Sequence, residues 1–434
     1  MQESIDKRAE ALTELSLKVW GFAEAGFLES QSAEVLMEYL SGEGFSITKG
    51  MAGMPTAFIA EYGSGKPILG YLGEYDALPR LSQEAATLTQ KPLVQNAPGH
   101  GCGHNLLGVG ALGAALMVKD AIAAGEITGT VRFYGTPAEE ILAGKVFMAR
   151  EGYFDDLDVC LTWHPFSSNA VNIGSSQALN SVKFHFHGRT AHAAGDPHNG
   201  RSALDAVELM NIGANYLREH VPTDVRIHYV TTYGGGEPNI VPAESSVWYY
   251  VRAPKREAVD EVYQRVIACA EGAARMTDTT FSIEFISGCY DTKNNEPIED
   301  MLQQKWQEVG AYQPTAEEKE WAKALIEGSC PEGHVAAAKH MKKVGVDITD
   351  KYIADFILPI MPTARGSSSP GSTDVGDVSY IVPTAQISAA CTALGTPGHS
   401  WQFTSCSASS FAQKAMLQAA KVMGLGGIEL MQNA

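Results

Sequence analysis

Residues 130–140 read TVRFYGTPAEE, and this stretch decides the fold of the chain. A short apolar run at 130–134 has the length of a strand, and two adjacent glutamates follow it after a glycine. Similar apolar runs at 68–72 and 159–163 are separated by helical patterns at 106–124 and 141–150, and the first forty residues also read as a helix. Strands that alternate with helices of this size are typical of βαβ units. The sequence therefore predicts an α/β domain with a mixed, largely parallel sheet and helices on both faces.

The pattern changes between residues 180 and 291. A strand at 181–187, a helix at 201–220, two strands at 225–233 and 245–251, a helix at 257–274 and a strand at 280–286 follow one another. The order β-α-β-β-α-β predicts a ferredoxin-like sandwich. We therefore expect residues 1–179 and 292–434 to form a discontinuous catalytic domain, with residues 180–291 inserted into it as a second domain.

The composition excludes several classes of protein. The chain has 434 residues, of which 45% are apolar and 19% charged, as in ordinary globular proteins. Its 32 basic and 50 acidic residues give a formal net charge of -18, which opposes binding to nucleic acid or to anionic membranes. The longest apolar run, at 108–118, is shorter than the roughly 20 residues that a membrane span needs.

The cysteines and the amino terminus point to the cytoplasm. The seven cysteines are scattered without regular spacing, so a disulfide framework is not expected. The first ten residues carry five charges where a signal peptide needs apolar side chains. We therefore expect a cytoplasmic protein with free cysteines, any one of which could act as a thiolate ligand.

Three local clusters carry residue types that bind metals or move protons. Cys102 and His104 lie two positions apart in a glycine-rich turn, so that both can face one ion. Glu139 and Glu140 follow the strand at 130–134, where one carboxylate could bind a metal while the other carries a proton. His164 comes at the end of the strand at 159–163. Each cluster also has a structural reading: an incidental cysteine, glutamates favoured by the helix dipole, or a histidine packed beside a tryptophan.

The position of these clusters favours one shared site. The carboxyl ends of parallel strands meet at the same edge of a sheet, and ligands of α/β proteins bind there. We therefore expect the three clusters to converge at that edge. The GxGxxG pattern at 108–113, by contrast, lies within a predicted helix rather than in the turn after a strand, so it does not predict a dinucleotide site.

The order of these motifs resembles that of the M20 metallopeptidases. The segments GEYDALP at 73–79, HGCGH at 100–104, PAEE at 137–140 and WHP at 163–165 are most similar to the amidohydrolase branch, which contains aminoacylases and auxin-conjugate hydrolases. The resemblance covers almost the whole chain and is weakest in the first 55 residues and at about 300–360. It implies two divalent metal ions, zinc or manganese or else cobalt or nickel, bound by Cys102, His104, Glu140, His164 and His399.

The same resemblance implies roles for three further residues. Glu139 would take a proton from a metal-activated water that attacks an amide carbonyl, and would return it to the departing amine. Asp76 would orient a ligand histidine, although Glu74 and Asp76 could also be an ordinary pair of loop carboxylates. The inserted domain would form a homodimer and act as a lid, and its His192 would reach the active site of the partner.

The resemblance implies that the substrate is a small amide, namely an N-acyl or p-aminobenzoyl amino-acid conjugate, with p-aminobenzoyl-glutamate as first choice. Its carboxylates would need local positive charge, which Arg252, Arg189 or Arg365 could supply together with the neutral donor Asn239. Backbone N–H groups of the loop at 366–372, which includes Gly371, could bind a carboxylate as well. Each arginine could equally pair with a surface acid, and the loop could be a flexible connector.

Two other functions fit the sequence. The chain could be a general aminoacylase or a dipeptidase on the same scaffold. It could also be a non-catalytic partner subunit, since the segments at 102–105, 371–378 and 395–401 resemble a subgroup in which a B-type subunit is paired with an A-type companion. The presence of Glu139 together with five ligand-type residues argues against a decayed site.

Overall fold

The computed structural model describes residues 1–433, which form two compact units. The first unit consists of residues 1–174, 293–367 and 378–433, and the second of Ser175–Thr292 and Ser368–Asp377. Residues 368–377 were predicted to lie in the catalytic domain, but here they lie with the inserted unit. The short helix α11 (Val375–Ser379) contains the point where the chain returns to the first unit.

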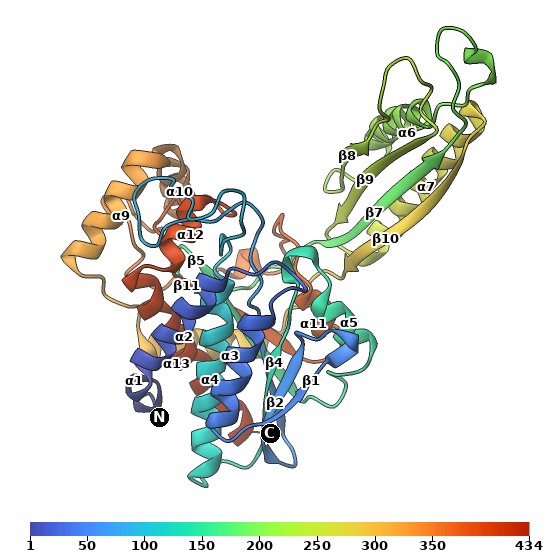
Figure 1. The fold of residues 1–434 in the computed structure, drawn as a ribbon. Helices are drawn as coiled ribbons and strands as arrows, with labels where there is room; N and C mark the ends of the chain where they lie inside the picture. Colours follow the sequence, from blue (N-terminus) through green and yellow to red (C-terminus); the bar gives the residue numbers. More distant parts are fainter. Residues whose placement is uncertain (434) are drawn as a thin grey trace. The chain divides into compact units, whose positions relative to one another are not determined.

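A seven-stranded sheet organises the first unit (Figure 1). In spatial order its strands are β1 (Ser46–Lys49), β2 (Phe58–Ser64), β4 (Gly129–Gly135), β3 (Ile68–Gly73), β5 (Val159–Phe166), β11 (Thr384–Ala390) and β6 (Ala170–Val171). The four central strands β4, β3, β5 and β11 are parallel, whereas β1, β2 and β6 pair antiparallel with their neighbours. The predicted α/β fold with a mixed, largely parallel sheet is confirmed. The glycine turn that joins β2 to β3 does not form a hairpin, because β4 lies between these two strands.

The helices of the first unit pack on this sheet or on one another. They are α1 (Glu3–Lys7), α2 (Ala9–Phe22), α3 (Ser30–Gly42), α4 (His104–Ala123), α5 (Gly144–Arg150), α8 (Glu296–Val309), α9 (Ala316–Ser329), α10 (Pro331–Lys343), α12 (Trp401–Ser407) and α13 (Ser410–Gln432). The first forty residues therefore form three helices rather than one. The chain turns between α2 and α3, where Ala23 and Phe27 have positive φ angles of 45° and 66°. This turn contains Glu29, which contacts the segment of Glu139 and Glu140.

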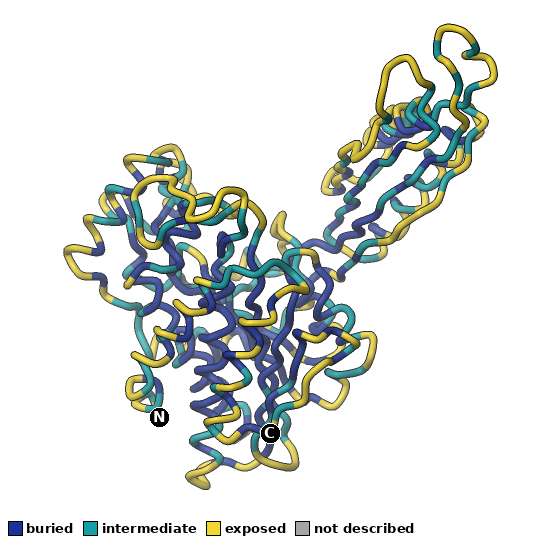
Figure 2. Tube along the Cα trace, viewed as in Figure 1, coloured by how far each residue is buried: buried dark blue, intermediate teal, exposed yellow. Residues whose placement is uncertain are grey.

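Two tyrosines show that both faces of the sheet are covered. Tyr71 of β3 lies opposite Phe133 of β4, and because side chains alternate along a strand, the next residue, Tyr134, points to the other face. The hydroxyl of Tyr71 donates to the carbonyl of Met423 on α13 at 2.9 Å, and that of Tyr134 donates to the carbonyl of Tyr153, just after α5, at 3.0 Å. Figure 2 shows the buried core along this sheet and its helices.

Helix α4 is the central helix of this core. Its 20 residues are long and apolar enough to cross a membrane, but most of them are buried inside the first unit. The glycines of its GxGxxG pattern allow close packing, since a Cβ at Gly110 would lie 2.6 Å from the ring of Trp163 and one at Gly108 would lie 2.6 Å from the carbonyl oxygen of Glu74. The pattern is therefore a packing feature, and it brings the start of α4 against β3 and β5.

The second unit is a four-stranded antiparallel sheet with two helices (Figure 1). Its elements are β7 (Ala178–His187), α6 (Ala203–Leu217), β8 (Arg226–Tyr233), β9 (Glu244–Ala253), α7 (Arg256–Thr277) and β10 (Thr280–Cys289), and the strand order is β10-β7-β9-β8. Apolar residues of the strands and of both helices form a core of their own. The predicted βαββαβ sandwich is confirmed.

Candidate metal centre

The predicted ligands gather at the carboxyl end of the central strands. Asp76 follows β3, and Glu140 follows β4 in a short 3-10 turn, Glu139–Ile141. His164 lies within β5 rather than after it. Cys102 and His104 do not lie at the end of a strand. They lie at the start of α4, after a long loop. The packing of α4 against the sheet delivers them to the same edge.

These side chains form one cluster in the first unit. The sulfur of Cys102 lies 3.4 Å from Nε2 of His164, and Nε2 of His399 lies 3.7 Å from Oε2 of Glu140. The potential ligand atoms of Cys102, His104 and His164 all lie within 4.8 Å of one another, and so do those of Cys102, Glu140 and His399. Cys102 is common to both groups. The geometry therefore offers a candidate metal site in which both groups share the sulfur of Cys102.

A third group contains two residues whose place the sequence did not reveal. His104 Nε2 lies 3.3 Å from Oε2 of Glu74 and 3.9 Å from Oε2 of Glu139. The ammonium group of Lys145, which is fully buried in α5, lies 2.7 Å from Oε1 of Glu74. The sequence allows Glu74 to be a loop carboxylate and does not indicate Lys145. The available signal was a single lysine within an otherwise apolar helical stretch after PAEE.

The donor set of this cluster fits a divalent cation. Glu74 Oε2, His104 Nε2 and Glu140 Oε1 are buried and have no hydrogen-bond partner within residues 1–433. An unsatisfied buried polar group costs about 1–3 kcal/mol, so native proteins rarely leave one. Two ligands that bind one zinc ion at ~2.1 Å in tetrahedral geometry lie about 3.4 Å apart. The 3.4 Å between the sulfur of Cys102 and Nε2 of His164 is close to that value.

Asp76 is placed to orient His104. Its Oδ1 lies 2.9 Å from Nδ1 of His104, and its Oδ2 accepts the backbone N–H of Glu140 at 2.9 Å. Burial opposes the ionisation of Asp76, but the charge of His104 and the hydrogen bond to it hold the Asp76 pKa below its usual value. Because Nδ1 is engaged in this way, Nε2 is the ring nitrogen left for an ion. The geometry supports the predicted orienting role, which stays a prediction.

The electrostatics of the cluster favour positive charge at its centre. Burial, aided by Asp76 and Glu74 and opposed by His104, raises the pKa of Glu140 to about 7. Burial and the charge of His104 lower the pKa of His164 to about 4, so its imidazole is neutral, as a metal ligand must be. Burial also raises the pKa of the Cys102 thiol. A cation would offset the burial of both the carboxyl and the thiol.

The other predicted residues lie in the second unit and do not form a single cluster there. The segment of His192 pairs with that of Asn239, before the start of β9. Arg252 lies near the opposite end of β9, where its Nη1 donates to the carbonyl of Pro370 at 3.4 Å, next to Gly371. The predicted substrate-binding residues Asn239, Arg252 and Gly371 are thus split between two places in the unit.

The three candidate arginines differ in their surroundings. Arg365 forms ion pairs with three acidic side chains of α8. It therefore pairs with acids of its own unit, as the alternative interpretation of the sequence expected. Arg189 donates from Nε to the carbonyl of Asn199 at 2.6 Å. Arg252 has a buried Nε without a hydrogen-bond partner among the described residues, and its guanidinium group lies over the ring of Tyr250. Arg252 and Arg189 each donate one hydrogen bond to a backbone carbonyl and keep further donors, whereas Arg365 is engaged by acidic side chains.

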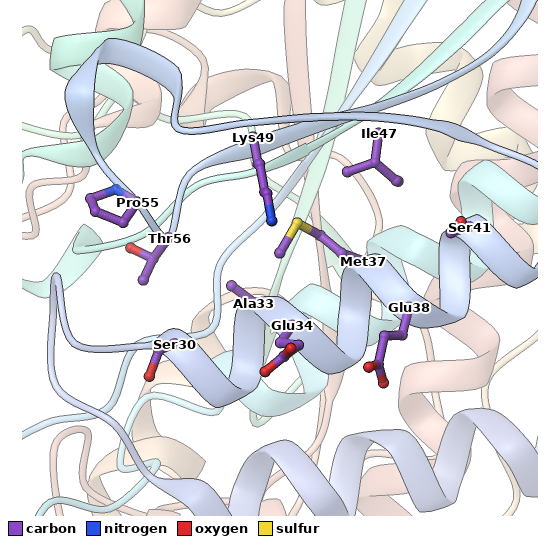
Figure 3. Close-up of a pocket in the computed structure, with 10 residues that line it drawn as sticks. All are labelled: Ser30, Ala33, Glu34, Met37, Glu38, Ser41, Ile47, Lys49, Pro55 and Thr56. Carbon is purple, nitrogen blue, oxygen red and sulfur yellow. The ribbon is translucent and has the colours of Figure 1, made fainter.

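A pocket of about 600 Å³ lies elsewhere in the first unit, between α3 and β1 (Figure 3). Met37, Glu34 and Glu38 line it from the helix, and Ile47 and Lys49 line it from the strand. None of the described residues that line it belongs to the ligand cluster. The pocket is therefore not the candidate active site.

Relatives of known activity resemble the chain over nearly its full length. Residues 175–278 match the family model of the peptidase dimerisation domain. The chain is 39% identical to the B-type subunit of p-aminobenzoyl-glutamate hydrolase from Escherichia coli (strain K12), over 99% of this chain and 91% of that protein. It is 29% identical to the Xaa-Arg dipeptidase of Mus musculus, over 99% of this chain and 87% of that protein.

Solved structures share the fold. A dinuclear metal binding peptidase from the M20 family, from Bacillus subtilis, matches with a TM-score of 0.62 at 16% identity, over 99% of this chain and 100% of that chain. An aminobenzoyl-glutamate utilization protein from Klebsiella pneumoniae matches with a TM-score of 0.64 at 16% identity, over 98% of this chain and 97% of that chain. These low identities show the fold alone, whereas the 39% identical relative shows the family. The chain therefore belongs to the M20 metallopeptidase family, as a metal-dependent amidohydrolase.

Proposed function

We propose that this protein hydrolyses the amide bond of small N-acyl or p-aminobenzoyl amino-acid conjugates, and that p-aminobenzoyl-glutamate is its best substrate. One observation carries the proposal: side chains from distant segments converge on one cluster of metal-binding donors, and Glu139 lies beside it. The name of the 39% identical relative supports the choice of p-aminobenzoyl-glutamate. The acidic composition and free cysteines fit a cytoplasmic enzyme, as we also propose.

We infer that two divalent ions bind per chain, one held by Cys102, His104 and His164 and the other by Cys102, Glu140 and His399. When bound, the ions supply a Lewis acid for the amide carbonyl and make a water molecule more acidic. Sulfur and imidazole ligands suit zinc, although manganese, cobalt or nickel also accept such donors, so the ion available in the cell decides the occupancy.

Glu139 is the residue we assign to proton transfer. Its carboxylate is 8% exposed, and its Oε2 lies 3.9 Å from Nε2 of His104, at the edge of the ligand cluster. From this position it would take a proton from the attacking water and deliver it to the nitrogen of the departing amine. Cleavage of the C–N bond then yields a carboxylic acid and a free amine.

We assign His192 to the stabilisation of the tetrahedral oxyanion in the active site of a partner chain. Its Nδ1 accepts the backbone N–H groups of Ala194 and Gly195 at 3.2 and 3.0 Å, so the neutral ring carries its proton on Nε2. An exposed N–H donor of this kind suits a developing negative charge. The dimerisation-domain match at 175–278 supports a homodimer, and the names of two relatives, each one subunit of a hydrolase, keep an A-type companion as the alternative.

For the substrate carboxylate we propose Arg252 as the principal cation, with the backbone near Gly371 and the amide of Asn239 as neutral donors. The position of the Arg252 guanidinium beside the carbonyl of Pro370 supports this choice, because a carboxylate can occupy two N–H groups of one guanidinium at once. Because Asn239 and Arg252 lie towards opposite ends of β9, we expect them to serve different chains of a dimer.

The decisive experiment is a substrate panel on the purified chain. After chelation the protein is reloaded with Zn²⁺, Mn²⁺ or Co²⁺ and assayed on p-aminobenzoyl-glutamate, hippurate and an Xaa-Arg dipeptide. We expect the highest kcat/KM for p-aminobenzoyl-glutamate. A higher kcat/KM for the dipeptide would favour the second candidate, a dipeptidase like the 29% identical relative. Activity that appears only after an A-type companion is added would favour the role of a non-catalytic subunit.

A glycine near the catalytic turn offers a further prediction. A Cβ at Gly144 would lie 1.8 Å from the carbonyl oxygen of Pro137, so Gly144→Ala must displace the turn that carries Glu139 and Glu140. We expect turnover to fall about 10²-fold, because small displacements of catalytic groups have effects of this size. In Gly272→Ala a Cβ meets nothing within 4 Å, and this control should keep full turnover. Wild-type kcat in Gly144→Ala would show that the turn tolerates the displacement.

A further inference from the structure

Glu29 is a buried carboxyl group between α2 and α3, far along the chain from the ligands. Its side chain is fully buried, with 0% exposed. Its Oε1 accepts the backbone N–H of Ala138 at 2.8 Å, and its Oε2 accepts the hydroxyl of Thr56 at 3.1 Å. Ala138 directly precedes Glu139. A side chain from the amino-terminal helices thus holds the backbone at the catalytic turn.

The turn needs such support because its backbone is strained. Ala138 has a φ angle of +58°, in the left-handed region that costs a residue with a Cβ about 1–2 kcal/mol. Strained backbone of this kind persists only where its surroundings hold it. Gly26 packs closely on it, since a Cβ there would lie 3.1 Å from Cα of Ala138. Residues 26–29 and the turn therefore form one packed unit.

Buried carboxylates anchor the turn on either side of Glu139. The N–H of Ala138 donates to Glu29, and the N–H of Glu140 donates to Oδ2 of Asp76 at 2.9 Å. Both anchoring oxygens accept from backbone groups, so neither bond depends on the rotamer of Glu139. Together they fix the peptide planes from which Glu139 and Glu140 project.

We propose that Glu29 is a positioning residue for catalysis, which holds the left-handed turn at Ala138 and thereby sets the direction of Glu139 and Glu140. This inference rests on the proposed function of Glu139 as proton carrier and Glu140 as metal ligand. Without the anchor the backbone of Ala138 relaxes toward an unstrained φ angle, and both carboxylates shift. Losses of about 10²-fold in rate are expected from shifts near 1 Å.

Two variants of Glu29 separate positioning from simple stabilisation. Glu29→Ala removes the acceptor of the Ala138 N–H, whereas Glu29→Gln keeps an oxygen at that place. We expect Glu29→Ala to lower kcat about 10²-fold with KM within about twofold of the wild-type value, and Glu29→Gln to keep most of kcat. Loss of kcat in both variants to the same extent would overturn the proposal, and so would a wild-type kcat in Glu29→Ala.

Glu24 provides the matched control. It lies in the same connection and accepts the backbone N–H groups of Gln31 and Ser32 at 3.1 and 2.9 Å, at the start of α3, without a contact to the turn. Glu24→Ala should lower the free energy of unfolding by about 1 kcal/mol, as the loss of a cap does, and leave kcat unchanged. If kcat falls in both Glu24→Ala and Glu29→Ala, and falls in each variant in proportion to its loss of unfolding free energy, Glu29 is merely structural.

A readout without turnover keeps the test independent of the proposed substrate. Because Glu140 leaves the same turn, Glu29→Ala should weaken Co²⁺ binding about tenfold or more in a titration against a chelator, and Glu24→Ala should not. Suppose that the wild-type chain cleaves none of the amides but still binds Co²⁺ more tightly than Glu29→Ala does. The proposed function then fails, and the positioning of the turn by Glu29 stands. Equal Co²⁺ affinity in wild type and Glu29→Ala contradicts the positioning role.

Discussion

Glu139→Gln is expected to lower turnover about 10²-fold or more while the protein keeps its full complement of metal ions. The amide has the same shape as the carboxylate but cannot accept a proton from the attacking water. Turnover is measured on p-aminobenzoyl-glutamate, and the ions are counted by mass spectrometry on the same preparation.

The neighbouring residue supplies the contrast. Glu140→Gln changes the adjacent side chain on the same turn, yet it should lose metal as well as turnover, because Oε2 of Glu140 lies 3.7 Å from Nε2 of His399 within the ligand cluster. Near-normal turnover in Glu139→Gln at full metal content would overturn its assignment. Loss of metal in both variants would instead make Glu139 a ligand.

Lys145→Met is expected to lower the free energy of unfolding by about 3–5 kcal/mol, since removal of one partner leaves a buried charge uncompensated. The ammonium group of Lys145 lies 2.7 Å from Oε1 of Glu74, and both side chains are buried. Burial opposes the ionisation of Glu74, but the charge of Lys145 and that of His104 hold the Glu74 pKa below its usual value. Urea unfolding of the metal-free protein measures the loss.

An exposed pair on the surface is the control for Lys145. Lys7 lies 3.8 Å from Glu3 with 76% and 84% of the two side chains exposed, so Lys7→Met should change stability by less than about 1 kcal/mol. The double variant Lys145→Met with Glu74→Gln should recover part of the loss, because no buried charge is then left alone. A double variant no more stable than Lys145→Met, or a wild-type stability in the single variant, would contradict the role of this pair.

The fold was predictable because the order of strands and helices follows from local patterns of apolar residues. Apolar runs of strand length that alternate with helical periods indicated the α/β unit, and the βαββαβ order identified the second unit. The pairing of β2 with β4 was not predictable, because a glycine turn between successive strands usually indicates a hairpin. The break between α2 and α3 was missed since apolar residues continue at helical intervals on both sides of it.

The site was predictable where chemistry shows in short motifs. Cys102 and His104 could be found from residue type and spacing, and Glu140 and His164 from residue type and position relative to strands. Glu29 could not, because a glutamate in a stretch that reads as an amphipathic helix looks like any solvated one. Its partner, the N–H of Ala138, lies more than a hundred residues along the chain, and only the tertiary structure brings them together.

The proposed ligands come from segments that span most of the chain, and we expect this to set the order in which the site is completed. Cys102 and His164 leave the ribosome long before His399, whose N–H donates to the carbonyl of Gly101 at 3.2 Å and so closes the cluster last. We therefore expect a nascent chain to lack the full set of donors until residue 399 has been made. We expect the metal ions that are available to the completed protein to decide which ion it binds. The same chain produced in cells with different metal supplies should therefore contain different ions.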